Sequence, residues 1–188
     1  MEHQLSHEGE AARRAVIDEI YRAFEGVTRE GGVSWNETDV RDGYGTPEEC
    51  EAARRSDKDT SWAELVEDRN WEPFPGVGGF CFVDATGFRY YFPVVMVRFA
   101  RGDVSEWFPG HLLEFLEQYA PSGSRVWTAA QLRATARFIE FMAKFDPTGY
   151  REAEDTKWED ALRQVWAPYL SIEVEEPRRK RIREVKRK

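Results

Sequence analysis

The sequence predicts an α+β fold that is mostly helical, with about five to seven helices and one small antiparallel hairpin or sheet. Apolar residues recur every three or four positions through several segments, which is the spacing of an amphipathic helix. Capping-box pairs, Ser or Thr followed three positions later by Glu or Gln, precede several of these segments. One stretch, residues 80–92, is instead rich in aromatic residues around a short turn, which predicts the hairpin.

The first third of the chain is expected to contain three helices. The first is amphipathic, because its apolar side chains form a single stripe. The second and third begin with capping boxes, formed by Thr46 with Glu49 and by Ser61 with Glu64. A turn-rich segment, Asp-Gly-Tyr-Gly at 42–45, separates the first helix from the second. The expected helices cover about residues 8–26, 47 onward and 62–67.

A hairpin is expected after the loop at 70–79, which contains two prolines and three glycines. Gly87 is able to take the positive φ of a bulged turn between the two strands. Pro93 ends the second strand, because proline cannot donate to a sheet ladder, and a further helix is expected to open there. The expected strands cover residues 80–83 and 88–92, and the helix covers about 94–101.

The C-terminal half is expected to contain three more helices. The best delimited begins after Thr128, which forms a capping box with Gln131. The last begins at Thr156, with Glu159 as its partner in the same arrangement. The expected helices start at about residues 109, 128 and 156, and residues 172–174 can add an edge strand.

The charge of the chain is unevenly distributed. Its 188 residues include 27 Lys and Arg against 35 Asp and Glu, which gives a net charge of −8. Residues 177–188 contain eight basic residues and one acid, so they carry +7 and leave −15 on residues 1–176. We therefore expect a single acidic globular domain over residues 1–170 and a basic C-terminal tail over residues 171–188. This distribution excludes a uniformly basic nucleic-acid binder for the domain.

The sequence favours a cytoplasmic protein without a cofactor. No stretch approaches the ~20 apolar residues of a membrane helix, and residues 1–10 are polar and acidic, unlike a signal peptide. No membrane partner is therefore expected. Cys50 and Cys81 stand alone without a CxxC neighbour, so neither a disulfide framework nor a zinc site is indicated.

No catalytic residue is assigned from the sequence. Nucleophilic catalysis needs a nearby base, which is usually histidine, and the three histidines lie at the polar N-terminus and at an expected helix start. Acidic residues are frequent between positions 39 and 68, but helix caps and first-turn charges account for several of them. We therefore interpret these acids as a solvated acidic face rather than as a metal or acid–base site.

Three tryptophans are candidates for partner binding: Trp35, Trp71 and Trp107. Each lies in a segment without helical periodicity, where an aromatic side chain serves either as a loop anchor or as an exposed contact. Aromatic residues dominate the binding energy of protein interfaces. These tryptophans are therefore interpreted either as loop anchors or as contacts in a partner site.

The basic tail has the charge density of a patch that binds nucleic acid or another anionic surface. Two other interpretations stay open, a solvated tail and a strap held on the acidic body of the same chain. The candidate contact residues are Arg178, Arg179, Lys180, Arg181 and Arg183.

Residues 84–96 carry a longer pattern, Asp-Ala-Thr-Gly-Phe-Arg-Tyr-Tyr-Phe-Pro-Val-Val-Met. It resembles the signature of an uncharacterised bacterial family known only as a domain of unknown function, typically Asp-Pro-Glu-Gly-Phe-Arg-Phe-Tyr-Leu-Pro-Ala-Tyr-Met. Residues 42–49 and the capped helix at 127–141 agree in the same order. The resemblance covers roughly residues 10–169 and implies kinship but no activity, because the family has none to transfer. The chain departs from the signature at Ala85 and Val95.

Four residues within the matching segments are candidates for binding a ligand or partner: Asp42, Tyr44, Arg89 and Tyr91. In a strand, Arg89 and Tyr91 would share one face of the hairpin. Arg89 is expected to pair internally with Asp84 or Asp42, although an anionic ligand is the alternative.

Three hypotheses of function follow. The first is a non-enzymatic protein-interaction domain, an immunity or regulatory partner that binds a basic protein. The second is a nucleic-acid-associated protein that uses the basic tail. The third is an enzyme of unknown reaction with a cleft around the four residues Asp42, Tyr44, Arg89 and Tyr91. The sequence does not indicate an oligomeric state.

Overall fold

The computed structural model describes residues 5–57, 61–73, 78–103, 109–119, 126–148 and 157–174. Within these ranges it contains eight α-helices and no strand. The predicted α+β class, with five to seven helices and a small hairpin or sheet, is therefore wrong, and the described chain is all helical. The helices are α1 (His7–Ala23), α2 (Trp35–Asp42), α3 (Pro47–Ser56), α4 (Trp62–Glu67), α5 (Ala85–Arg101), α6 (Pro109–Tyr119), α7 (Ala129–Phe145) and α8 (Trp158–Ala161).

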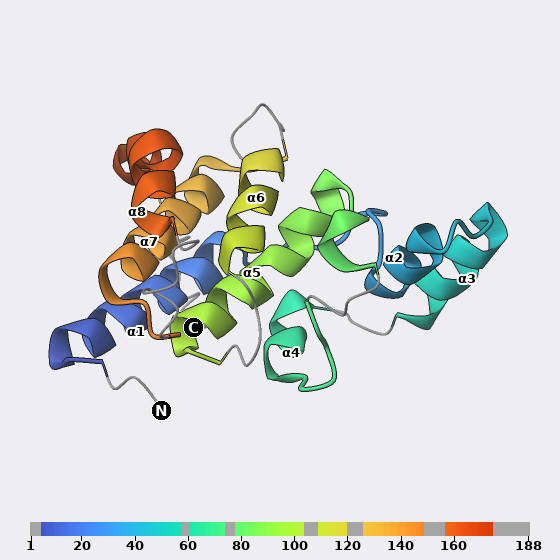
Figure 1. Ribbon diagram of the computed structural model, residues 1–188, viewed down its shortest axis with the longest axis horizontal. Coiled ribbons are helices and arrows are strands. Elements are labelled where there is room, and N and C mark those ends of the chain that lie inside the picture. Colours follow the sequence, from blue (N-terminus) through green and yellow to red (C-terminus); the bar gives the residue numbers. More distant parts are fainter. Residues whose placement is uncertain are drawn as a thin grey trace, which may run out of the picture.

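Helix α5 lies at the centre of the molecule (Figure 1). Helices α1 and α7 pack against each other and against α5, and α4 also packs against α5. Helix α8 and the turns that follow it pack on α7. Helices α2 and α3 pack mainly on each other and extend beyond the start of α5, at the right of Figure 1. We call this pair the arm.

Of the segment predicted to be a hairpin, residues 80–83 form part of a short 3-10 helix (Gly79–Cys81) and the residues after it, and residues 85–92 form the first half of α5. Asp84, expected in the turn, is the N-cap, and its Oδ1 accepts the backbone N–H groups of Gly87 at 2.7 Å and Val33 at 3.1 Å. Gly87 is needed for close packing, because an added Cβ would lie 2.6 Å from the Val33 carbonyl oxygen. Residues 90–100 are all buried, so α5 from Tyr90 onward lacks the polar face that identifies an amphipathic helix.

Pro93 lies inside α5 rather than at the start of a helix. The expected helix at 94–101 is therefore the second half of a longer helix that begins at Ala85. Proline removes one backbone donor, which normally weakens a helix interior. Burial of the side chains on all sides of α5 offsets this loss.

The expected helices outside the hairpin region are largely confirmed. Capping boxes begin α3, with Thr46 and Glu49, and α7, with Thr128 and Gln131. The start of the last expected helix, Thr156, lies outside the described residues, and α8 begins at Trp158.

Two further expectations, for residues 172–174 and for the residues before Asp42, differ from the structure. Residues 172–174 form no strand. Helix α2 covers residues 35–42, where the sequence predicted no helix, and Glu37 provides the missed signal. Its Oε2 accepts the backbone N–H of Ser34 at 3.2 Å, three positions earlier, as in a capping box.

Aromatic side chains dominate the core around α5. Phe88 and Phe92 stack with their ring centroids 4.9 Å apart, and Trp127 packs edge-on against Phe92 at 6.0 Å. Trp158 packs in the same way against Phe138 at 5.7 Å. None of the helices in the described ranges combines the length and the apolar character that crossing a membrane requires.

Arg98 on α5 is a buried cation, only 5% exposed. Its guanidinium donates to the carbonyl oxygens of Val66 at 3.1 Å, Trp71 at 3.0 Å and Leu65 at 2.6 Å, and also to that of Asp68. These carbonyls belong to the end of α4 and the loop after it, where a helix carries partial negative charge and unpaired acceptors. Burial lowers the pKa of the Arg98 guanidinium, which remains protonated at neutral pH. Arg98 therefore fixes α4 and its loop against α5.

Arg98→Met should lower the free energy of unfolding by about 3–5 kcal/mol, because four buried or half-buried carbonyls lose their donor. Urea denaturation followed by circular dichroism measures this change. Arg137→Met is the control, since Arg137 makes an exposed ion pair with Glu140 and should cost at most about 1 kcal/mol. Equal losses in the two variants would show that the carbonyl network contributes little.

Candidate functional site

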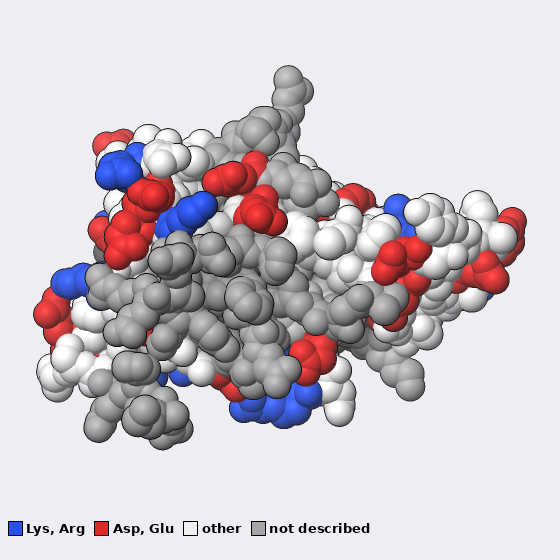
Figure 2. All heavy atoms as spheres, in the orientation of Figure 1, with Lys and Arg blue, Asp and Glu red and all other residues white. Residues whose placement is uncertain are grey.

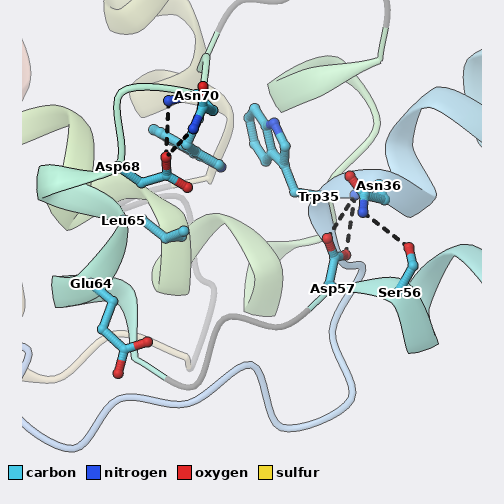
Figure 3. Close-up of a pocket in the computed structure, with 9 residues that line it drawn as sticks. Trp35, Asn36, Ser56, Asp57, Glu64, Leu65, Asp68 and Asn70 are labelled. Carbon is cyan, nitrogen blue, oxygen red and sulfur yellow. Dashed lines mark hydrogen bonds between the residues drawn. The ribbon is translucent and has the colours of Figure 1, made fainter.

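A pocket opens between the arm and α4 (Figure 3). We call it the acidic pocket. Its volume is about 400 Å³, within the range of ~300–1,000 Å³ that small-ligand sites occupy. One side comes from the start of α2 and the end of α3, and the other from α4 and the loop after it. The lining residues are Trp35, Asn36, Ser56, Asp57, Glu64, Leu65, Asp68, Asn70 and Trp71.

The lining combines three carboxylates with two indoles, and among the described residues it includes no Lys, Arg or His. Asp57 lies on the arm side of the pocket, whereas Glu64 and Asp68 lie on the α4 side (Figure 3). A cation inside the pocket would therefore have negative charge on two sides and aromatic rings at the wall. Within the described ranges, no group of three His, Cys, Asp or Glu side chains is arranged to hold a metal ion.

The aromatic wall of the acidic pocket is fixed by α5. Trp35 packs with its ring centroid 4.7 Å from that of Trp71, 5.2 Å from Phe80 and 5.0 Å from Tyr91. The Tyr91 hydroxyl, fully buried, accepts the backbone N–H of Trp35 at 2.9 Å. The structure thus brings together three of the residues selected from the sequence: Trp35, Trp71 and Tyr91.

Asp57 joins the end of α3 to the start of α2. Its Oδ2 accepts the backbone N–H of Asn36 at 3.1 Å and lies 3.4 Å from the Arg29 Nη1. The Asn36 side-chain amide donates to the Ser56 hydroxyl at 3.0 Å. The arm side of the pocket is therefore a hydrogen-bonded junction between two helices, and it presents one ion-paired carboxylate.

On the α4 side of the pocket, hydrogen bonds hold both the carboxylate and the backbone carbonyl of Asp68. Its Oδ1 accepts the backbone N–H of Asn70 at 2.9 Å and the Asn70 side-chain amide at 3.3 Å, while its carbonyl oxygen accepts from Arg98. The Oδ2 atom is outside these contacts. Asp68 consequently offers a carboxylate oxygen from a fixed position.

Glu37 holds the two helices of the arm together. Its carboxylate is 1% exposed and accepts from Arg41 Nε at 3.0 Å on α2 and from Arg54 Nε at 3.0 Å on α3. Burial raises the pKa of Glu37, but hydrogen bonds from Arg41, the Ser34 amide and Arg54 together outweigh it, so the pKa is lowered overall. The ionised form of Glu37 therefore stabilises the arm.

The other sequence-selected residues make separate contacts. Asp42 Oδ2 accepts the backbone N–H of Gly78 at 2.8 Å. Tyr44 is 97% exposed in the connection between α2 and α3 and has a positive φ of 56°. Arg89 donates to Glu30 Oε1 and to the Val126 carbonyl, both at 2.9 Å.

Arg89 pairs internally as expected, but with Glu30 instead of Asp84 or Asp42. It does not share a face with Tyr91, because two positions along a helix turn a side chain through about 200°. The shared face was expected for a strand, and α5 is a helix. Trp107 and the tail candidates Arg178, Arg179, Lys180, Arg181 and Arg183 lie outside the described residues.

A family model described as a family of unknown function, DUF6714, matches residues 12–170. The chain belongs to this family. The DUF6714 match runs from within α1 to the turn after α8, and it leaves residues 171–188 outside. It agrees with the kinship expected from residues 84–96. Comparisons with curated proteins and with solved structures found no match.

Sequence reasoning placed the pocket carboxylates on a solvated acidic face, which agrees with the exposure of Glu64 and Asp68, but it did not place them beside Trp35 and Trp71. A signal was available, because Asp57 and Asp68 are the C-cap residues of α3 and α4. A carboxylate is unfavourable beside the partial negative charge of a helix C-terminus. These acids stabilise neighbouring backbone instead of their own helices, because Asp57 accepts the N–H of Asn36 on α2 and Asp68 accepts that of Asn70.

Glu37→Gln should lower the free energy of unfolding by about 1–3 kcal/mol at pH 7, because hydrogen bonds to a charged acceptor are replaced by neutral ones. The stability that wild-type Glu37 adds is complete above the unfolded pKa of about 4.3 and is lost as pH falls through the lower folded pKa. Urea denaturation between neutral pH and pH 3 should therefore show a smaller acid-induced loss in the variant.

Glu51→Gln is the matched control for this measurement. Glu51 lies in the same arm, and its side chain is 70% exposed in an ion pair with Arg55. Its substitution should change stability by no more than about 0.5 kcal/mol. An acid dependence that Glu37→Gln leaves unaltered would contradict the role of this carboxylate.

Proposed function

We propose that this chain is a non-enzymatic protein-interaction domain that binds a basic protein in the cytoplasm, the role of an immunity or regulatory partner. One observation carries the proposal. The acidic pocket joins three carboxylates and two indoles, and the described part of its lining has no basic residue. Aromatic anchors surrounded by polar residues are typical of interface hot spots, and the carboxylates select a cationic partner.

The charge of the domain supports the same type of partner. Residues 1–176 carry −15, which attracts a basic protein over distances longer than direct contacts. On the face drawn in Figure 2, acidic side chains spread over the arm at the right and over the opposite end of the molecule. A basic partner would therefore be steered toward the domain before it reaches the pocket.

A peptide of repeated Arg-Gly-Ser units tests this function, with a Glu-Gly-Ser peptide of equal length as its control. The basic peptide should bind the full chain, and its affinity should fall by about tenfold between about 50 and 300 mM salt, as screening shortens the Debye length. Isothermal titration calorimetry measures both values. Equal binding of the acidic peptide, or no binding of the basic one at low salt, would overturn the proposal.

A nucleic-acid partner is the second candidate, favoured by the +7 charge of residues 177–188. The five tail candidates would contact phosphates, while the acidic domain stays away from the backbone. Replacing all five with Ser in the full chain should weaken binding of single-stranded DNA and reduce the slope of log affinity against log salt by about 3.5. Fluorescence anisotropy measures this slope. An unchanged slope would exclude the tail as the contact.

A further inference from the structure

We infer that the acidic pocket is a receptor for a single arginine side chain presented by the basic partner. This inference rests on the proposed function and specifies the group that is recognised. The volume of about 400 Å³ suits one long side chain with part of its backbone, not a folded surface. The indoles of Trp35 and Trp71 form the aromatic part of the lining, and carboxylates lie on two sides.

Arginine fits this chemistry better than lysine. A guanidinium is planar, so it stacks on an aromatic ring while its edge donates to carboxylates in a forked arrangement. An ammonium is a compact, strongly hydrated charge that loses more hydration on entering such a site. The chain already contains this type of contact, because the Arg98 guanidinium carbon lies 5.5 Å from the centroid of the Trp71 ring.

The two acids at the helix ends provide the charge. Asp68 holds one oxygen in a turn with Asn70, and its Oδ2 lies outside those hydrogen bonds. Asp57 uses its carboxylate to cap α2 and contacts Arg29 at 3.4 Å, a longer ion pair than most in the described chain. Asp68 is therefore the principal acceptor for the incoming guanidinium, and Asp57, whose charge Arg29 partly neutralises, contributes less.

The wall also contains a donor that lacks an acceptor. Trp71 is 6% exposed, and its indole Nε1–H has no hydrogen-bond partner within the described ranges. A buried donor in this state is unfavourable. That Nε1 atom has less than 1 Å² of accessible surface, so a backbone carbonyl of the arginine-bearing peptide reaches it only if the Trp71 ring moves when the peptide binds.

The test uses the full chain, labelled with ¹⁵N, and three capped tripeptides, Gly-Arg-Gly, Gly-Lys-Gly and Gly-citrulline-Gly. Citrulline keeps the shape of arginine without its charge. The side-chain N–H resonances of Trp35 and Trp71 should shift with the arginine peptide, less with lysine and hardly with citrulline. Shifts of equal size with citrulline, or shifts confined to the other tryptophans, would overturn the assignment.

Asp68→Asn should weaken binding of the arginine peptide by about tenfold, because a charged hydrogen bond is lost while the Oδ1 acceptor for Asn70 is kept. Asp160→Asn is the matched control, since Asp160 lies on α8 in an exposed pair with Arg163 and should leave the affinity unchanged. Equal effects of the two substitutions would refute the pocket as the site.

Two further results distinguish failure of the arginine pocket from failure of the proposed function. If the longer Arg-Gly-Ser peptide binds without moving the Trp35 and Trp71 resonances, the proposed function survives and the arginine pocket is refuted. The Trp35 and Trp71 resonances of the wild-type chain without peptide are also compared with those of the variant whose five tail residues are replaced by Ser. If the wild-type resonances already lie where the arginine peptide moves those of the variant, the tail of the same chain is the occupant, and the assignment to a partner is overturned. No change on tail replacement supports the partner.

Discussion

The buried guanidinium of Arg98 is the interaction on which the arrangement around α5 depends. One side chain from the central helix satisfies four carbonyls at the end of α4 and in the loop that follows. Carbonyls at a helix end must find donors when water is excluded, and a cation also complements their partial charge. Because the same loop contains Asp68, Asn70 and Trp71, this structural contact also positions one side of the acidic pocket.

The opposite side of the pocket depends on α5 in a similar way. The Tyr91 hydroxyl accepts the N–H of Trp35, and the Asp84 carboxylate accepts that of Val33, so the chain entering α2 is tied to the central helix. Glu37 then joins α2 to α3 through two arginines. The residues that resemble the family signature are therefore mostly architectural, yet their packing creates the pocket that the proposed function uses.

Sequence reasoning predicted helix starts that depend on residues close together in the chain. It failed for α5, whose conformation depends on burial by other parts of the chain. The capping boxes of α3 and α7 follow from residues three positions apart, so they were predictable. Residues 88–92 were misassigned because a run rich in aromatic residues is compatible with a strand and with a buried helix. The same ambiguity placed Arg89 and Tyr91 on one face, whereas the helix turns them to different neighbours.

The sequence by itself determined the amphipathic helices, the capped helix starts, the family kinship and the opposite charges of residues 1–176 and 177–188. Each of these properties depends on composition or on residues close together in the chain. Only the tertiary structure decided that α5 is a buried helix and that Trp35 and Asp57 meet Asp68 and Trp71 across a pocket. Those contacts join residues far apart in sequence, and burial of α5 by its neighbours removes the periodicity from which a helix is recognised.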